Sequence, residues 1–330
     1  RIPADLLSRR ATLAPVSEQV WHEAKQNNDF ASFAPYLQKM LDLAKEQADA
    51  VGYEEHPFDA LVFEYEPSMT ASKLRALFAD LKAGLLPLLA RIVQHDRPLE
   101  KDLWAQEYPV DTQRAFALEM AEKIGYDLSR GRLDIAPHPF EISFTRQDVR
   151  ITTRYNRKYF PMALFGTLHE AGHALYEQNI DPALTRTALA TDFLGQYAVG
   201  GTSYGAHEAS SRLWENQIGR SRAFWDVHYG RLRELFPEQL AGVDVDLFHR
   251  AVNRVKPSLI RVEADEVTYN LHIMLRVEIE MALLEGSLSI ADLPDAWRAR
   301  MREYVGVEPA TDSQGALQDV HWSGGSFGAF

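Results

Sequence analysis

Apolar residues recur every three or four positions along much of this chain, which is the pattern of amphipathic helices. Asp29 is a helix-capping residue type, Gly52 is a stop signal, and Pro87 is expected to kink or break the helix around it. The pattern predicts helices over about 15–26, 29–51, 70–94, 111–125, 207–224, 259–285 and 293–306.

Residues 133–155 have a different character. Glu141–Phe144 and Asp148–Tyr155 are rich in Ile, Phe, Val, Thr and Tyr, and predict a β-hairpin. Alternation places Asp148, Arg150 and Thr152 on the same side of the second strand. Such a polar row is either a solvated surface or the border of a cleft, and the pattern leaves both open. We therefore expect a mainly α fold with a small β-hairpin or short sheet.

Few helix or strand signals occur between residues 180 and 205, which predicts a loop, and His56-Pro57-Phe58 predicts a turn. No internal repeat and no phosphate-binding glycine motif is visible. We expect a single, mostly helical domain over residues 1–330. Within it, residues 1–130 form a helical subregion and residues 131–330 carry the chemistry.

One stretch carries a metal-binding pattern. It is His169-Glu170-x-x-His173, flanked by apolar residues at helical spacing and preceded by Pro161, a residue suited to the first turn of a helix. Two residues four apart project from the same face of a helix, so both imidazoles can reach one cation. Glu170 then lies beside the ion, where a general base for a water molecule is needed.

Composition restricts the chemistry further. The chain of 330 residues is 46% hydrophobic, with a net charge of −12 and no cysteine. The acidic balance argues against nucleic acid and against an anionic membrane surface as partners. No apolar run reaches the roughly 18 residues of a membrane span. Any metal must be held by His, Asp, Glu or water, and a cytoplasmic location is the default expectation.

A catalytic zinc site usually has a third protein ligand. Asp192 follows His173 by 19 residues, while Glu208 lies on the next predicted helix, which would be a rigid platform. Residue chemistry alone does not choose between these two carboxylates.

Six motifs in order along the chain resemble the carboxypeptidase Taq family of zinc metallocarboxypeptidases. They are His138-Pro139-Phe140, Asp148-x-Arg150-x-Thr152, His169-Glu170-x-x-His173, His207-Glu208, Ile260-Arg261-x-x-x-Asp265-Glu266 and Gly315-x-x-Gln318-Asp319-x-His321-Trp322. The resemblance covers about residues 5–330. Ala209-Ser210-Ser211 depart from the family pattern. The family is also longer at both ends, so we expect a fragment that lacks both termini.

The resemblance implies a zincin-like helical fold with a deep cleft, a homodimer, and removal of C-terminal residues from peptides. It implies Glu208 as the third ligand of one Zn²⁺ per chain, with Co²⁺ or another divalent ion as an alternative, and Glu170 as the general base. Arg150 and Arg261 become candidates for binding the terminal carboxylate, which a guanidinium can contact through both oxygens. His321 becomes a candidate for stabilising the oxyanion, and Asp265 an alternative partner for a ligand histidine.

Three other interpretations stay open. The same site could serve an oligopeptidase that cuts peptides internally, or a zinc-stabilised helical module that binds peptides without turnover. A chain that binds no metal is the third. The expected substrate is a peptide with a free C-terminus.

Overall fold

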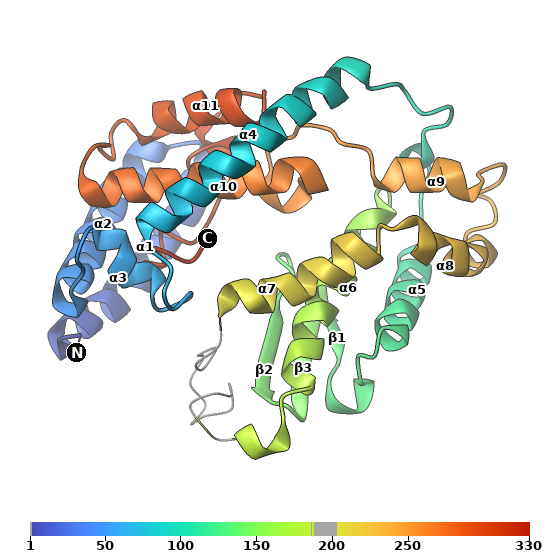
Figure 1. Ribbon diagram of the computed structural model, residues 1–330, viewed down its shortest axis with the longest axis horizontal. Coiled ribbons are helices and arrows are strands. Elements are labelled where there is room, and N and C mark those ends of the chain that lie inside the picture. Colours follow the sequence, from blue (N-terminus) through green and yellow to red (C-terminus); the bar gives the residue numbers. More distant parts are fainter. Residues whose placement is uncertain (1, 186, 188–202) are drawn as a thin grey trace. The chain divides into compact units, whose positions relative to one another are not determined.

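The computed structural model describes residues 2–185, 187 and 203–330. Helices account for most of these residues, and the strands form one small three-stranded sheet, so the predicted mainly α fold class is confirmed (Figure 1). The chain divides into two compact units. Unit 1 comprises Arg1–Asp96 and Val255–Phe330, and unit 2 comprises Arg97–Arg254.

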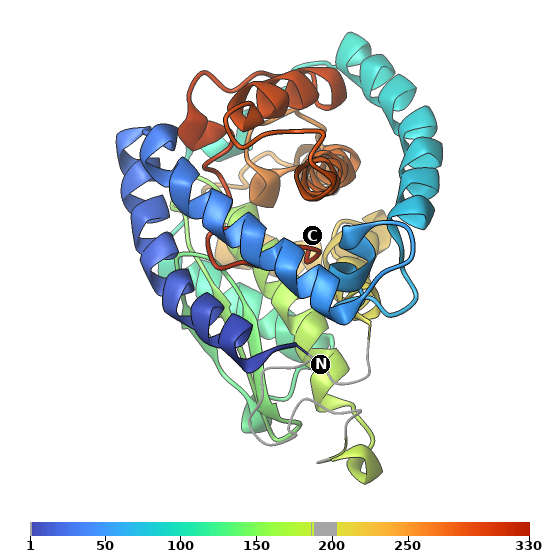
Figure 2. The same cartoon turned by 90° about the vertical axis from the view of Figure 1, so that its left-hand side faces the viewer.

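Unit 1 is helical and has one large apolar core. Helices α1 and α2 run side by side, and α10 packs against α2, α3, α4 and α11 (Figure 2). The helices of this unit are α1 (Ala4–Asn27), α2 (Phe30–Val51), α3 (Pro57–Val62), α4 (Ala71–His95), α10 (Glu266–Glu285) and α11 (Leu293–Tyr304), with 3₁₀ turns at Arg261–Glu263 and Asp312–Gln314.

Two fully buried polar residues on α10, Arg276 and Glu280, hold the last stretch of unit 1. Arg276 Nε lies 2.5 Å from Asp319 Oδ2. One turn further on, Glu280 accepts hydrogen bonds from Trp322 Nε1 at 2.6 Å and from the backbone N–H of Gly328 at 3.0 Å. Buried charges without such partners are costly, so these contacts fix the path of residues 315–330 over α10.

Unit 2 is built around α6 (Phe160–Gln178), which packs against the sheet, α5 and α7. Phe160, Leu164 and Leu168 enter one apolar core, while Ala171 and Ala174 enter a second one, so two sides of α6 are covered. The other elements are α5 (Val110–Lys123), β1 (Leu133–Ile135), β2 (Glu141–Thr145), β3 (Asp148–Thr153), α7 (Tyr204–Arg212), a π-helical turn (Leu213–Ile218), α8 (Arg222–Leu235), α9 (Val245–Val252), and 3₁₀ turns at Leu103–Ala105, Leu128–Arg130 and Pro182–Leu184.

Strand β3 is the centre of the sheet. It pairs antiparallel with β2, as the predicted hairpin requires, and parallel with β1, which the sequence analysis missed. Val149 and Ile151 on β3 are fully buried, and Asp148 and Arg150 are partly exposed, as the predicted alternation requires, but Thr152, the third residue of the predicted polar row, is buried. A three-residue strand such as β1 has too short a pattern to stand out in a sequence.

Several predicted helix boundaries are confirmed. Asp29 caps α2 through the backbone N–H of Ser32, and Gly52 follows its last residue. Thr70 caps α4 as predicted, but a break at Pro87 was wrong, because the helix continues through that residue to His95. The metal-site helix α6 carries Pro161 in its first turn.

Other boundaries were wrong. Helix α1 begins at Ala4, not near residue 15, and continues through Pro15. Helix α10 begins at Glu266, not near residue 259, because the Asp265 carboxylate accepts the backbone N–H groups of Val267 and Thr268 and ends the preceding segment. Arg261 therefore lies outside α10, in the 3₁₀ turn Arg261–Glu263.

A single continuous helix over 207–224 was also wrong, because a π-helical turn and a break at Gly219–Ser221 interrupt it. The turn predicted at His56 opens the short helix α3, with the His56 ring accepting the backbone N–H of Phe58. Helix α9 was missed.

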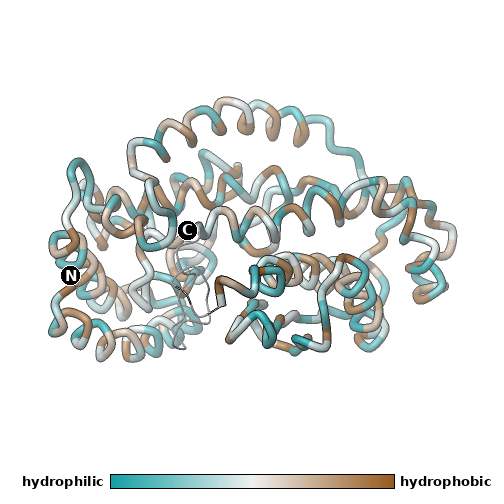
Figure 3. The backbone as a smooth tube through the Cα atoms, turned by 60° about the horizontal axis from the view of Figure 1, so that its bottom comes forward, coloured by the Kyte–Doolittle hydropathy of each residue, from teal (hydrophilic) through white to brown (hydrophobic). Residues whose placement is uncertain are grey.

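Along the helices, apolar and polar residues alternate within a turn or two (Figure 3). In the part of the chain that the structure describes, none of the helices has the length and apolar character that a membrane crossing requires.

Candidate metal centre

The uncovered side of α6 presents the two histidines of the H-E-x-x-H motif. Their ring centroids lie 4.9 Å apart, with the ring planes at 80°. Helix α7 begins after Ser203, which caps it through Ala206, and runs along α6. It brings Glu208 to the same place, so that the Nε2 atoms of His169 and His173 lie 3.7 and 3.2 Å from Glu208 Oε2.

These three residues are a group that could hold a metal ion, with one donor atom from each lying within 4.8 Å of the others. Donors about 2.0–2.1 Å from a tetrahedral ion are separated by roughly 3.3 Å. The observed separations of 3.2 and 3.7 Å from Glu208 to the two imidazoles therefore fit such an ion. The Glu208 side chain is 39% exposed, which leaves one side of the group open to water or substrate.

The close approach of α6 and α7 depends on Gly172, between the two histidines. A Cβ added at Gly172 would lie 2.6 Å from Ser211 Cα and 2.8 Å from Ser210 O, distances that only a glycine avoids. Ser210 Oγ also donates a 2.8 Å hydrogen bond to Gly172 O. The helix backbones are thus nearly in contact where Glu208 faces the histidines.

Glu215, in the π-helical turn, supports His169 from behind. Its Oε2 lies 2.9 Å from His169 Nδ1 and accepts from Arg212 Nη1 at 2.9 Å, while Arg220 Nη2 lies 3.5 Å from its other oxygen. A carboxylate that accepts Nδ1–H leaves His169 Nε2 free to bind a metal. Sequence reasoning missed Glu215, because a lone glutamate in a predicted helix resembles an ordinary surface residue.

Charge around the histidines is predominantly negative. Burial raises the pKa of Glu208, but the hydrogen bond to His173 and the charge of His169 outweigh it and hold that pKa at about 2. Burial likewise raises the pKa of Glu215, and its bond to His169 brings it to about 2. Ionised Glu208 beside two imidazoles forms a donor set suited to a divalent cation, and ionised Glu215 bonds to the Nδ1 side of His169.

Glu170 lies beside this group and is only 6% exposed. Burial raises its pKa to about 7, with His169 opposing the shift. It is not one of the three clustered donors, so its carboxylate can accept a proton in place of binding the ion.

Arg150, on β3, makes two bonds to its neighbour Asp148, with Nε–Oδ1 at 2.7 Å and Nη2–Oδ2 at 2.8 Å. Its side chain is 43% exposed, and its guanidinium lies over the Phe144 ring, 5.2 Å from the centroid. Two of its three nitrogens are thus engaged within the sheet.

Arg261 and His321 belong to unit 1, where both lie close to Asp319. Arg261 Nε is 3.6 Å from Asp319 Oδ1, and burial raises the pKa of Asp319 while the charges of Arg276, Arg261 and His321 bring it to about 2. The His321 ring contacts that of Phe330, with centroids 4.5 Å apart. Their predicted roles in catalysis stay predictions.

Of the remaining sequence candidates, Asp192 lies outside the described residues. Asp265 caps α10 and also accepts from Thr268 Oγ1 at 2.8 Å and from the backbone N–H of Lys256 at 3.1 Å. Both of its oxygens thus accept hydrogen bonds within unit 1, from α10 and from Lys256.

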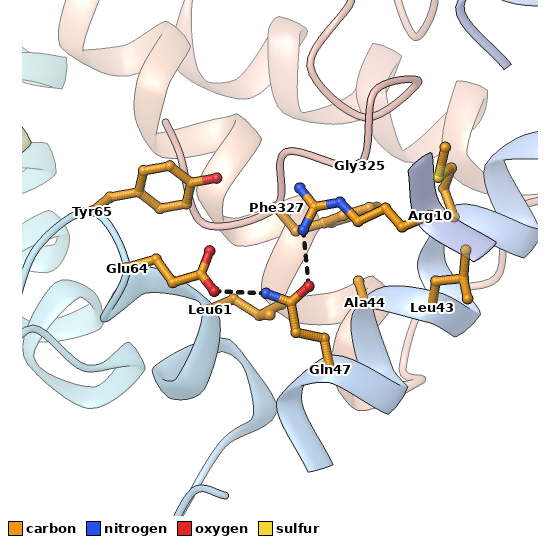
Figure 4. Close-up of a pocket in the computed structure, with 10 residues that line it drawn as sticks. Arg10, Leu43, Ala44, Gln47, Leu61, Glu64, Tyr65, Gly325 and Phe327 are labelled. Atoms are coloured by element: carbon orange, nitrogen blue, oxygen red, sulfur yellow. Dashed lines mark hydrogen bonds between the residues drawn. The ribbon is translucent and has the colours of Figure 1, made fainter. Parts of the chain in front are cut away.

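Unit 1 contains a small pocket of a different kind (Figure 4). Arg10 Nη1 donates to Gln47 Oε1 and Gln47 Nε2 donates to Glu64 Oε1, each at 2.8 Å. The polar side chains in its wall therefore satisfy one another. No histidine lines this pocket, so it is a poor candidate for the metal centre.

A mainly helical chain with paired histidines on one helix and a carboxylate on the next has the donor arrangement of a metallohydrolase. Comparison with protein families places it within that class. The chain belongs to the carboxypeptidase Taq (M32) metallopeptidase family, whose model matches residues 1–330. The family implies a divalent metal, and His169, His173 and Glu208 are a group in the described chain that could hold one.

Individual relatives agree with this assignment. The chain is 42% identical to carboxypeptidase 1 of Bacillus subtilis over 330 residues and 46% identical to thermostable carboxypeptidase 1 of Thermus thermophilus over 339 residues. A crystal structure of the M32 carboxypeptidase from Deinococcus radiodurans superposes with a TM-score of 0.91 at 43% identity, covering 99% of this chain and 65% of that one. The matches to these two carboxypeptidases include the whole of this chain. They span 64% of the length of each relative.

Proposed function

We propose that this chain is the metal-bearing part of a zinc-dependent metallocarboxypeptidase, which releases C-terminal residues from peptides. The observation that carries the proposal is the convergence of His169, His173 and Glu208, in a chain of the carboxypeptidase Taq (M32) family. The relatives' names as carboxypeptidases support the substrate class.

His169 and His173 would bind Zn²⁺ through Nε2, and Glu208 would bind it through Oε2, with one ion per chain. When bound, the ion supplies Lewis acidity toward water and toward the scissile carbonyl. Glu170 takes the proton of the attacking water and passes it to the leaving amine, a role for which its burial beside the metal group suits it. Elemental analysis of protein purified without chelator tests the identity and stoichiometry of the metal.

Recognition of a free C-terminus needs a cation for the terminal carboxylate. Arg150 and Arg261 are the candidates, and His321 is the candidate for stabilising the oxyanion. The Arg150 side chain is the more exposed of the two arginines, at 43% against 11%. Its Nη1 is the nitrogen that Asp148 does not engage, so that is the atom that would bind a substrate carboxylate.

The experiment compares one peptide with a free C-terminus and the same peptide amidated, with products read by mass spectrometry. A carboxypeptidase shortens the free peptide stepwise and leaves the amidated one intact. Equal internal cleavage of both would indicate an oligopeptidase, and retained zinc with no cleavage of either would indicate a binding module. Glu170→Gln is expected to keep zinc and lose cleavage by roughly 100-fold or more.

The family resemblance also supports a homodimer, which sedimentation velocity would test. A cytoplasmic location is proposed with it, and cell fractionation is the corresponding measurement.

A further inference from the structure

We propose that His207 and Glu177 are positioning residues for the metal ligand His173, forming a proton-ordered chain behind its ring; this inference rests on the proposed metal site. His173 Nδ1 and His207 Nδ1 are 2.6 Å apart, and His207 Nε2 is 2.9 Å from Glu177 Oε1. His207 and Glu177 are 8% and 1% exposed, so water does not compete for these bonds.

The metal contact determines where each proton lies. His173 binds through Nε2, the nitrogen that faces Glu208, so its Nδ1 must carry the ring proton. His207 Nδ1 then has to accept that proton's hydrogen bond and must itself be unprotonated. The His207 proton is consequently on Nε2, where it is donated to the Glu177 carboxylate. One arrangement of protons satisfies every contact.

The orientation of the rings agrees with this assignment. The His173 and His207 centroids are 4.8 Å apart, close to the sum of the N–N distance and the two ring radii, and the planes are inclined by only 29°. The two Nδ1 atoms therefore point at each other along the line between the rings. The Tyr176 ring also packs against His207, with the two centroids 4.6 Å apart, which restricts rotation of the His207 ring.

The groups of this proton-ordered chain come from two pairs of residues that are close in the sequence. His173 and Glu177 are one turn apart on α6 and so share a face. His207 and Glu208 are neighbours on α7, so one residue reaches the metal while the other reaches the rear of a ligand. The close approach at Gly172 keeps α7 near enough for both.

The two histidine ligands thus have different supports. His169 bonds directly to a carboxylate, Glu215, whereas His173 reaches its carboxylate, Glu177, through an imidazole. Groups behind a ligand typically change metal affinity about 10–100-fold when removed. Loss of the interposed imidazole should therefore weaken metal binding even though His207 does not touch the ion.

The test measures Zn²⁺ affinity by competition with a chromophoric chelator for the whole chain and for His207→Phe, His207→Gln and Glu177→Gln. We expect His207→Phe to weaken affinity roughly 10–100-fold. Glutamine can accept from His173 and donate to Glu177, so His207→Gln should restore much of the loss. His228→Phe on α8, where the histidine ring packs beside Phe224, is the matched control and should bind as the parent does.

Nitrogen-detected NMR of the histidine rings supplies a second readout that packing alone would not move. In the zinc-bound parent, His173 should carry its proton on Nδ1 and His207 on Nε2. His207→Phe should remove the hydrogen bond that the His173 Nδ1 proton donates, and Glu177→Gln should allow the His207 proton to occupy either ring nitrogen.

Parent-like affinity in folded His207→Phe, or weakening that His207→Gln does not relieve, would overturn the inference, as would the opposite tautomers in the parent. A parent chain that binds no Zn²⁺ would instead refute the proposed function, and with it the metal contact that orders the protons.

Discussion

Gly172→Ala perturbs the metal site without touching any metal-binding group. The added Cβ would lie 2.6 Å from Ser211 Cα, where ordinary contacts begin at 3.4 Å, so α6 and α7 must separate by about 0.8 Å. The obstructing atoms are backbone atoms of α7, which cannot rotate away as the end of a long side chain could. Glu208 is on α7 and moves with it.

The size of the effect follows from two opposing contributions. Overpacking costs about 1–3 kcal/mol, while replacing glycine by alanine within a helix gains about 0.5–1 kcal/mol. We expect a net loss of about 1–2 kcal/mol in the free energy of unfolding of the metal-free chain. Because donor distances matter within about 0.2 Å, a shift of this size should also weaken Zn²⁺ binding at least 10-fold.

Gly166→Ala is the matched control, because Gly166 is on the same helix and a Cβ there would meet only Thr153 Oγ1, at 3.6 Å. Gly166→Ala should leave the free energy of unfolding unchanged or raise it, and should leave the Zn²⁺ affinity unchanged. Urea unfolding in the presence of a chelator measures the free energy of unfolding of the metal-free chain. Competition with a chromophoric chelator measures the Zn²⁺ affinity. If Gly172→Ala matches Gly166→Ala in both, the helices do not approach as described and the argument for Glu208 as a ligand loses its geometric basis.

Three further predictions concern other parts of the chain. Burial raises the pKa of Glu280 to about 8, so the folded state holds a proton that the unfolded state releases near pH 4.5; the free energy of unfolding should fall as pH rises from about 5 to 8, and urea titrations should show a flatter profile for Glu280→Gln. Arg276→Met leaves Asp319 buried without its closest partner and should cost about 3–5 kcal/mol in urea unfolding, much of which Asp319→Asn in the same chain should recover; no recovery would contradict the pairing. Arg150→Lys loses the guanidinium fork and should raise KM for free-C-terminus peptides more than it lowers kcat, whereas unchanged kinetics would exclude Arg150 from carboxylate binding.

The local part of the metal site could be predicted from sequence because it depends on helix geometry alone. His169 and His173 are four residues apart, and every α-helix places such residues on the same face. Glu208 could not be chosen over Asp192 on these grounds, since the choice depends on how two helices pack. The resemblance to a family favoured Glu208, and the structure brings that residue within 3.2 Å of His173 Nε2.

The supporting groups show where sequence patterns stop being informative. Glu177, Glu215 and His207 are ordinary helix residues by composition, and each acquires its significance from a partner 30 or more positions away or on another helix. Glu215 reaches His169 from a π-helical turn, a feature that no periodicity rule anticipates. Boundary errors have a related origin, because Asp265 ended one segment by a capping bond that outweighed the apolar pattern running through it.

Gly172 belongs both to the sequence motif and to the packing between α6 and α7. In the sequence it is one of the two unspecified positions of the motif, and helix propensity would favour alanine there by about 1 kcal/mol. The structure accounts for the glycine through a contact that lies outside its own helix, with the backbone of α7. That contact brings Glu208 to the front of the histidine pair and His207 to the rear of His173, so both groups depend on the absence of a single methyl.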